Sequence, residues 1–304
     1  WKFFEEHWAQ SVIGHSALSN LLHLALFDEA MDSLPSQRLG VYLQENQPWE
    51  FAAIQSWKRF SHGKLIGTPH STVRFWDLRY FFDTRSFDRL DTFRVPCPHK
   101  VAVNGPAAYQ EYLSAGYDTN DLVEVEALRY AHLSVSANIN KMPRSELTLL
   151  VLGDFSEFNN QLQLDLLEGA MRLLEGKITV VYKAHPSAPL DVVKYPMFKS
   201  NVTNKDLRVL LNQCDIVFTS SETSAGVEAY CIGLPVISVL NLNTLNLSPL
   251  MGYAGVDFIT KPQHLADKLS TFNFDGPIQP NRNKYFWFDP KLSRWSVVLE
   301  LSVM

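Results

Sequence analysis

The second half of the sequence repeats one pattern: a short apolar run, then a longer segment with apolar residues at helical spacing. Repeated strand–helix units of this length are typical of a parallel, doubly wound sheet. In open parallel sheets, ligands bind outside the carboxyl ends of the strands. The predicted strands are 147–152, 178–182, 202–203, 216–218, 236–240 and 257–259, and the predicted helices are about 159–175, 206–212, a segment ending at Cys231, and 262–272.

The first half is less regular, but its pattern also predicts an α/β domain. A helix is expected over 16–31, where the leucines are dense enough to predict burial. The other predicted elements are strands at 39–43, 100–103 and 123–125 and helices at 51–60 and 107–115.

The best boundary between two domains is a polar stretch from His132 to Glu146. We therefore predict domains at 1–140 and 141–304, and 304 residues are enough for two cores. The chain opens on Trp1-Lys2-Phe3-Phe4 rather than on Met, so we expect that an N-terminal portion of the protein is missing.

The composition excludes several classes of function. A net charge of −5 gives no support to nucleic-acid binding, which usually leaves a basic footprint. The three cysteines are widely spaced and form no CxxC pair, which favours reduced thiols over disulfides. No apolar run is long enough to span a bilayer, and no signal peptide is present. We therefore expect a cytoplasmic protein.

The most informative segment follows the predicted strand 216–218. Three hydroxyl residues come next, among them Ser220 and Ser221, and a helix with small residues on its first turn is expected after them. Backbone N–H groups and hydroxyls at the start of a helix suit a phosphate. We include Thr223 in this set and assign Glu228, one turn into the helix, to sugar hydroxyls. Together these features predict a nucleotide-binding half-domain.

The alternative for the same segment is a capping box between Thr219 and Glu222 that binds nothing. A second segment favours the nucleotide site. The strand 178–182 runs into Lys183-Ala184-His185-Pro186, and because Pro186 stops the strand, His185 lies at its carboxyl end. His185 could donate to a phosphate oxygen or protonate a leaving phosphate, although a lone histidine is more often structural. Gly153, at the end of 147–152, completes the predicted nucleotide-binding set.

These motifs resemble those of a known enzyme group. Two α/β domains with the nucleotide site in the second form the plan of GT-B glycosyltransferases, in which two Rossmann-like domains face a cleft. Lys183-Ala184-His185-Pro186 resembles the His-Pro motif of bacterial sialyltransferases and Kdo transferases, which use CMP-sugars. Thr219-Ser220-Ser221 resembles their phosphate-binding Ser-Ser/Thr motif. Segments 42–50 and 67–77 are similar to a family of bacterial O-antigen or capsule biosynthesis proteins.

The resemblance implies transfer of a Kdo- or sialic-type sugar from a CMP-sugar to a surface-polysaccharide acceptor, either a glycan or a glycolipid. It implies His185, Ser220 and Ser221 at the phosphate and Glu228 at the ribose or cytosine. No Asp-x-Asp is present to hold a metal-bound diphosphate, so we expect no metal and no cofactor besides the nucleotide-sugar donor. Peripheral association with the inner membrane is a further expectation.

The catalytic base departs from the family pattern, because the sequence has no clean acidic-acidic-Gly motif. Glu45, at the end of the predicted strand 39–43, is the first candidate, and His70 and Asp77 are weaker ones. Glu45 is almost as compatible with a non-catalytic role as a solvent-exposed carboxylate in a turn. For His70, a structural histidine that is hydrogen-bonded within its loop is the more common case. Arg74 could bind the carboxylate of a nonulosonic acid or pair with Asp77.

Two other functions remain open on the sequence alone. The same serine-rich loop would also serve a GT-B transferase that uses a UDP- or GDP-sugar. A sugar-nucleotide epimerase or a non-catalytic GT-B-like binding subunit is the third possibility, from a different functional class.

Overall fold

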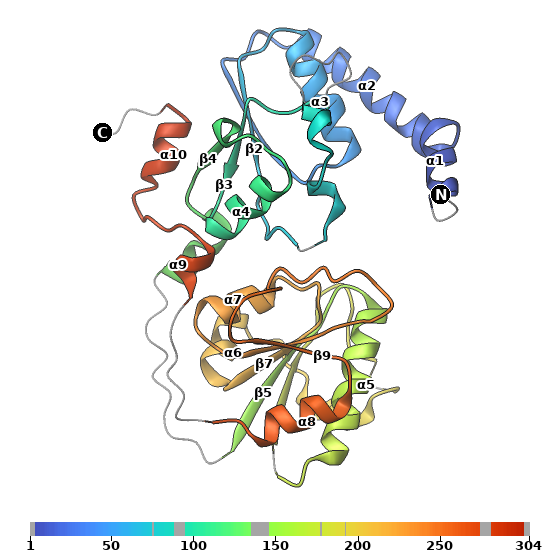
Figure 1. Cartoon of the computed structure of the whole chain (residues 1–304), viewed down its shortest axis with the longest axis vertical. Coiled ribbons are helices and arrows are strands. Elements are labelled where there is room, and N and C mark those ends of the chain that lie inside the picture. Colours follow the sequence, from blue (N-terminus) through green and yellow to red (C-terminus); the bar gives the residue numbers. More distant parts are fainter. Residues whose placement is uncertain are drawn as a thin grey trace. The chain divides into compact units, whose positions relative to one another are not determined.

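A computed structural model describes residues 4–74, 76–87, 95–134, 146–176, 178–191, 193–273 and 281–300. The chain forms two compact units (Figure 1). Unit 1 comprises 1–70, 78–128 and 291–304, and unit 2 comprises 71–77 and 129–290.

Unit 2 is built on a five-stranded parallel sheet in the order β6-β5-β7-β8-β9. The chain runs outward from β5 first to β6 and then, on the other side, to β7, so the topological switch point lies between β5 and β7. Ligands bind at such points in doubly wound sheets. The strands are β5 (Leu147–Leu152), β6 (Ile178–Lys183), β7 (Ile216–Thr219), β8 (Val236–Val239) and β9 (Val256–Ile259).

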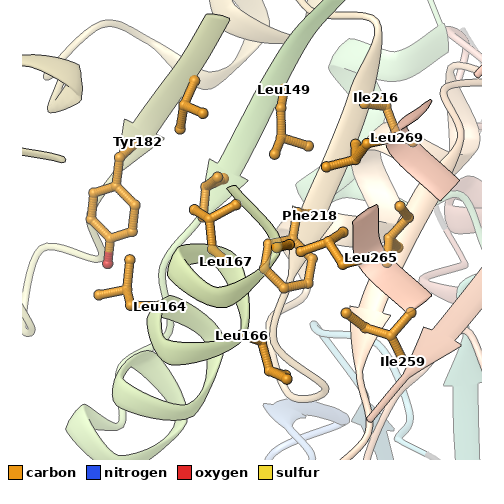
Figure 2. Close-up of a cluster of buried hydrophobic side chains, with 14 of the residues drawn as sticks. Leu149, Leu164, Leu166, Leu167, Tyr182, Ile216, Phe218, Ile259, Leu265 and Leu269 are labelled. Carbon is orange, nitrogen blue, oxygen red and sulfur yellow. The ribbon is translucent and has the colours of Figure 1, made fainter. Parts of the chain in front are cut away.

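Helices cover the sheet of unit 2 and bury its apolar side chains. Leu164 and Leu167 of α5 and Leu265 and Leu269 of α8 pack against the strands in one cluster (Figure 2). Ser156 caps α5 by accepting from the Asn159 N–H. The helices of this unit are α5 (Glu157–Leu173), α6 (Leu207–Gln213), α7 (Ala225–Cys231), α8 (Pro262–Ser270) and α9 (Arg282–Tyr285), with 3₁₀ segments η4 (Leu128–Ser134) and η5 (Pro196–Asn201).

Unit 1 holds a four-stranded parallel sheet in the order β1-β2-β3-β4. Leu65 packs with α3 residues on one face, and Ile66, the next residue of β2, packs with Trp295 and Val298 of α10. The strands are β1 (Leu39–Leu43), β2 (Lys64–Thr68), β3 (Lys100–Val103) and β4 (Leu122–Glu124). The helices are α1 (Glu5–Val12), α2 (His15–Ser33), α3 (Pro48–Arg59), α4 (Pro106–Ser114) and α10 (Ser293–Val298), with 3₁₀ segments η1 (Leu78–Tyr80), η2 (Thr84–Phe87) and η3 (Thr119–Asp121).

The predicted elements are largely confirmed, with ends that shift by a few residues. The short strand expected at 202–203 is reduced to a bridge between Tyr182 and Val202. Helix α3 begins earlier than predicted because Pro48 fits its first turn and Gln47 and Glu50 form a capping box.

The predicted burial of the α2 leucines is wrong. Leu21, Leu22 and Leu26 are each about three-fifths exposed. The C-terminal half of α2 packs on α3, where Phe27 stacks on Trp49 and Asp28 accepts from Ser56. Apolar density alone overstated the burial, because α3 covers only part of this helix surface.

The compact units differ from the predicted division in where the chain crosses between them. The main segment of unit 2 starts at Arg129, whereas the predicted second domain starts at 141, and the segment from Lys291 belongs to unit 1. The return is held by buried Glu126, whose carboxylate accepts from the Arg294 and Trp295 N–H groups at the start of α10. The indole of Trp295 donates to the Glu126 carbonyl at 2.9 Å. In the described part of the chain, no helix is long and apolar enough to cross a membrane.

Glu50 organises the loop that follows β1. Its buried carboxylate accepts from the N–H groups of Glu45, Asn46 and Gln47 at 3.0–3.2 Å. Burial raises the pKa of Glu50, and the three N–H donors oppose that shift. The loop therefore owes its shape to a carboxylate that the sequence did not single out.

Replacing Glu50 by Ala is expected to lower the free energy of unfolding by about 2–4 kcal/mol, because the buried N–H of Asn46 and the partly buried N–H groups of Glu45 and Gln47 lose their acceptor. Chemical denaturation measures the change. Glu157→Ala is the matched control, since Glu157 is also a first-turn acid but is exposed. Equal small effects of the two substitutions would show that Glu50 does not hold the loop.

Candidate functional site

The switch point of unit 2 carries a polar cluster that joins the ends of β5 and β7. The register places Leu152 beside both Lys183 and Thr219, so the three strands end at the same level. Asp154, fully buried after β5, accepts a hydrogen bond from the hydroxyl of Ser220, which follows β7. Its other oxygen accepts from the Ser156 N–H at 2.9 Å.

Two amide side chains of α5 hold this cluster in place. Asn160 accepts from the Asp154 N–H at 2.6 Å and donates to the Asp154 carbonyl at 2.8 Å. Gln163 donates to the carbonyls of both Leu152 and Phe218 at 3.1 Å, which ties the two strand ends together. These four hydrogen bonds join the ends of β5 and β7 to α5.

The Ser220 hydroxyl has a single hydrogen, and it donates this hydrogen in its bond to Asp154. It therefore cannot donate to a phosphate at the same time. Its assignment to the phosphate stays a prediction that requires the hydroxyl to change partner. Ser221 and Thr223 lie in the same loop, where the Thr223 hydroxyl accepts from the Ala225 N–H at 3.4 Å. The alternative capping box does not form, since the Thr219 hydroxyl donates to the Ser220 carbonyl and α7 begins only at Ala225.

His185 lies just beyond β6 with a defined tautomer. Its Nδ1 accepts from the Ser187 N–H at 3.2 Å and contacts the Ser187 hydroxyl at 2.7 Å. A backbone N–H can only donate, so in the neutral ring the proton is on Nε2. The ring also makes an edge contact with Phe155, in the loop after β5. His185 thus presents an Nε2–H donor at the carboxyl edge of the sheet.

Gly153 permits close packing where β5 ends. A Cβ at this position would lie 2.8 Å from the Tyr182 hydroxyl and 3.2 Å from the His185 nitrogen. Burial and the nearby Asp154 charge raise the pKa of Tyr182 to about 12, so its hydroxyl stays protonated. That hydroxyl has no hydrogen-bond partner among the described residues. A Cβ at 153 would therefore require the Tyr182 side chain to shift and the His185 backbone to move slightly.

The other predicted residues of unit 2 have mixed surroundings. Lys183 donates to the Lys205 carbonyl at 2.8 Å, which orients its ammonium group along the chain surface. Pro186 is exposed and follows His185 outside the strand, as predicted from its missing N–H. Glu228, on the first turn of α7, contacts His132 Nε2 at 2.8 Å, and both side chains are more than four-fifths buried. His132 lies in η4.

In unit 1, two of the predicted base candidates come together at the carboxyl ends of adjacent strands. Glu45 follows β1 and His70 follows β2, and a Glu45 carboxylate oxygen lies 3.7 Å from His70 Nε2. Arg79, which the sequence did not single out, lies 3.9 Å from the other carboxylate oxygen. These distances are too long for hydrogen bonds, and an ion pair between partly exposed side chains contributes at most about 1 kcal/mol. Glu45 remains about two-fifths exposed and so can meet a ligand.

The same edge carries buried polar atoms without partners in the described part of the chain. They include Gln44 Oε1, Thr68 Oγ1 and His70 Nδ1. The Gln44 side chain lies across Gly67 of β2, where a Cβ would approach Gln44 Oε1 to 2.4 Å. Buried polar atoms are normally hydrogen-bonded.

Arg74 and Asp77 belong to unit 2 by compactness, unlike Glu45 and His70. Asp77 is buried, with 8% of its surface exposed, which makes it a poorer base candidate than Glu45. Its N–H donates to the Arg74 carbonyl at 3.2 Å. Within the described ranges, no group of three or more His, Cys, Asp or Glu side chains could hold a metal ion.

Two cavities lie near the sheet of unit 2. One of about 470 Å³ is lined by Leu147 and Ile178, at the amino ends of β5 and β6. The other, about 190 Å³, is lined by Tyr182 and Asn160 and by Asp191 of the following loop. The larger cavity is at the edge opposite the polar cluster, where doubly wound sheets do not bind their ligands, so we assign no site to it.

No family model matches the chain, and no curated protein matches it. Solved structures do. MurG from Acinetobacter baumannii aligns with a TM-score of 0.58 at 9% identity over 93% of this chain and 78% of that one. MnaA from S. aureus with UDP aligns with a TM-score of 0.55 at 12% identity over 94% and 82%. A UDP-N-acetylglucosamine 2-epimerase aligns with a TM-score of 0.50 at 12% identity over 91% and 75%.

The fold is GT-B-like, with two Rossmann-like domains. Identities this low establish the fold alone. The resemblance to CMP-sugar enzymes, the role of each site residue and the cleft between the domains stay predictions.

Proposed function

We propose that this chain is a glycosyltransferase that moves a sugar from a nucleotide sugar to a hydroxyl group of a glycan or glycolipid. The observation that carries the proposal is the carboxyl edge of the sheet in unit 2, where Asp154 contacts Ser220 at the switch point and His185 follows the adjacent strand β6. This is the place where doubly wound sheets bind nucleotides. The unpartnered polar atoms at the corresponding edge of unit 1 support an acceptor site there.

In the proposed reaction, the acceptor oxygen forms a bond to the anomeric carbon while the bond from that carbon to the phosphate oxygen breaks. Glu45 takes the acceptor proton, and the departing phosphate keeps the bonding electron pair. His185 Nε2–H and the Ser221 hydroxyl donate to the charge that develops there, which is the interaction that lowers the barrier. Glu228 accepts from a ribose hydroxyl through the oxygen that does not contact His132.

We propose a UDP-sugar as the donor. The similar MnaA structure contains UDP, and another similar protein is named for UDP-N-acetylglucosamine. The second candidate is a CMP-linked nonulosonic acid, which the strand-end His185 within Lys183-Ala184-His185-Pro186 favours. In that case Arg74 would bind the sugar carboxylate. An epimerase is the third candidate, because an epimerase is among the similar folds.

Thermal unfolding with single nucleotides tests the proposal. UDP at about 100 times its Kd is expected to raise the Tm by roughly 3–8 °C, since a ligand of the folded state stabilises it. CMP and GDP are expected to give smaller shifts, and EDTA should change nothing because the proposed mechanism uses no metal. A larger shift with CMP would select the second candidate, and no shift with any nucleotide would contradict the proposal.

Product analysis separates transfer from epimerisation. A transferase releases UDP in proportion to acceptor glycosylated, whereas an epimerase changes the sugar without an acceptor. Epimerised sugar formed in the absence of acceptor would replace the proposed activity by the third candidate.

A further inference from the structure

Asn241 has a side-chain donor that nothing in the described part of the chain satisfies. It follows β8 and is only 9% exposed. Its Oδ1 accepts from the Asn243 N–H at 2.9 Å. Because a backbone N–H can only donate, this contact fixes which end of the amide is oxygen. The other end, Nδ2, is buried and has no hydrogen-bond partner among the described residues.

This donor lies at the same edge as the proposed nucleotide site. Strands β7 and β8 are adjacent, with Thr219 beside Ser238. The Ser238 hydroxyl donates to the Ser220 carbonyl at 3.2 Å, which joins the two strand ends. Neighbouring strands are about 4.8 Å apart. Asn241 therefore emerges one strand away from Ser220 and Ser221, on the side where a ligand would be bound.

Asn246, in the same loop, makes the same kind of turn as Asn241 without leaving a buried amide nitrogen unpartnered. Its Oδ1 accepts from the Ser248 N–H at 2.9 Å, the same local turn that Asn241 makes. The Asn246 amide nitrogen, however, contacts Met251 Sδ at 3.2 Å and lies near the surface. Turn formation thus accounts for Oδ1 of Asn241 but not for its buried Nδ2. Buried amide donors of this kind normally have a partner.

We propose that Asn241 is a ligand-binding residue whose Nδ2 donates to an oxygen of the bound nucleotide sugar. This inference rests on the proposed function. Residues 240–256 carry no charged side chain and no histidine. The donor that this loop offers, Asn241 Nδ2, is therefore uncharged. It selects a ligand oxygen through a directed hydrogen bond and not through charge attraction. That oxygen belongs either to the phosphate or to a hydroxyl of the transferred sugar, and both accept the same hydrogen bond.

Isothermal titration calorimetry on the full chain tests the inference. UDP and UDP-glucose are titrated into the wild type, Asn241→Asp and Asn241→Ala, with CMP and a CMP-sugar as the replacement pair if CMP is the nucleotide bound. Asn241→Asp keeps the oxygen that forms the turn and removes the donor. Asn241→Ala removes the donor without adding charge. Asn246→Asp and Asn246→Ala are matched controls in the same loop, and the Tm of each variant shows that it is folded.

Both Asn241 variants are expected to bind the nucleotide sugar about tenfold or more weakly, the effect of losing one good hydrogen bond. Both Asn246 variants should stay within about twofold of the wild type. If affinity is lost for UDP-glucose alone, the Asn241 hydrogen bond is to the sugar. If affinity is lost equally for UDP, the hydrogen bond is to the nucleotide. Wild-type affinity in folded Asn241→Ala, even if Asn241→Asp binds weakly, overturns the inference. If the wild type binds no nucleotide, the proposed function fails, and this inference fails with it.

Discussion

His185→Ala is expected to lower turnover by about 10²- to 10³-fold, the usual effect of removing one donor to charge that develops in the transition state. The Ser187 N–H holds the ring so that its Nε2–H is the donor. The loss should fall on kcat more than on nucleotide affinity, because the interaction strengthens as the phosphate leaves. Steady-state kinetics with the preferred donor measure both effects.

The control for this prediction is His264→Ala, because His264 is an exposed histidine on α8 of the same unit. Its replacement should leave kcat unchanged. The Tm of His185→Ala should stay close to that of the wild type, since the side chain lies outside the core. A normal rate in a folded His185→Ala protein would remove this histidine from the mechanism.

Glu45→Gln is expected to lower transfer by about 10²-fold or more while nucleotide binding stays nearly intact. The substitution keeps the size of the side chain but removes its ability to take a proton. The carboxylate lies near His70 and Arg79, in the unit that does not carry the proposed nucleotide cluster. Transfer rates and nucleotide affinity, measured on the same preparation, separate the two effects.

Parallel variants decide between the base candidates. Glu29→Gln, at an exposed position on α2, is the control and should leave the rate of sugar transfer unchanged. If Glu45→Gln transfers at the wild-type rate and His70→Ala does not, His70 becomes the base. A loss confined to Asp77→Asn would instead assign that role to a buried carboxylate. Normal rates in all three would place the base outside these residues.

Part of the site could be read from the sequence because its signals are local. Pro186 stops β6, so His185 had to lie at a strand end, and Ser220 had to follow β7. Parallel strands then bring such residues to one edge. Asn160 and Gln163 could not be found in the same way. Each is an amide in a helical pattern, and only the packing of α5 directs it onto a strand end.

The sequence by itself determined the alternation of strands and helices, since side-chain periodicity and the Pro, Ser and Asp residues at element ends act over a few residues. Only the tertiary structure decided which distant groups meet. His132 contacts Glu228 across 96 positions and Asp154 contacts Ser220 across 66. It also decided that the α2 leucines are exposed. Burial and long-range pairing depend on what packs against each surface, and no local pattern encodes that partner.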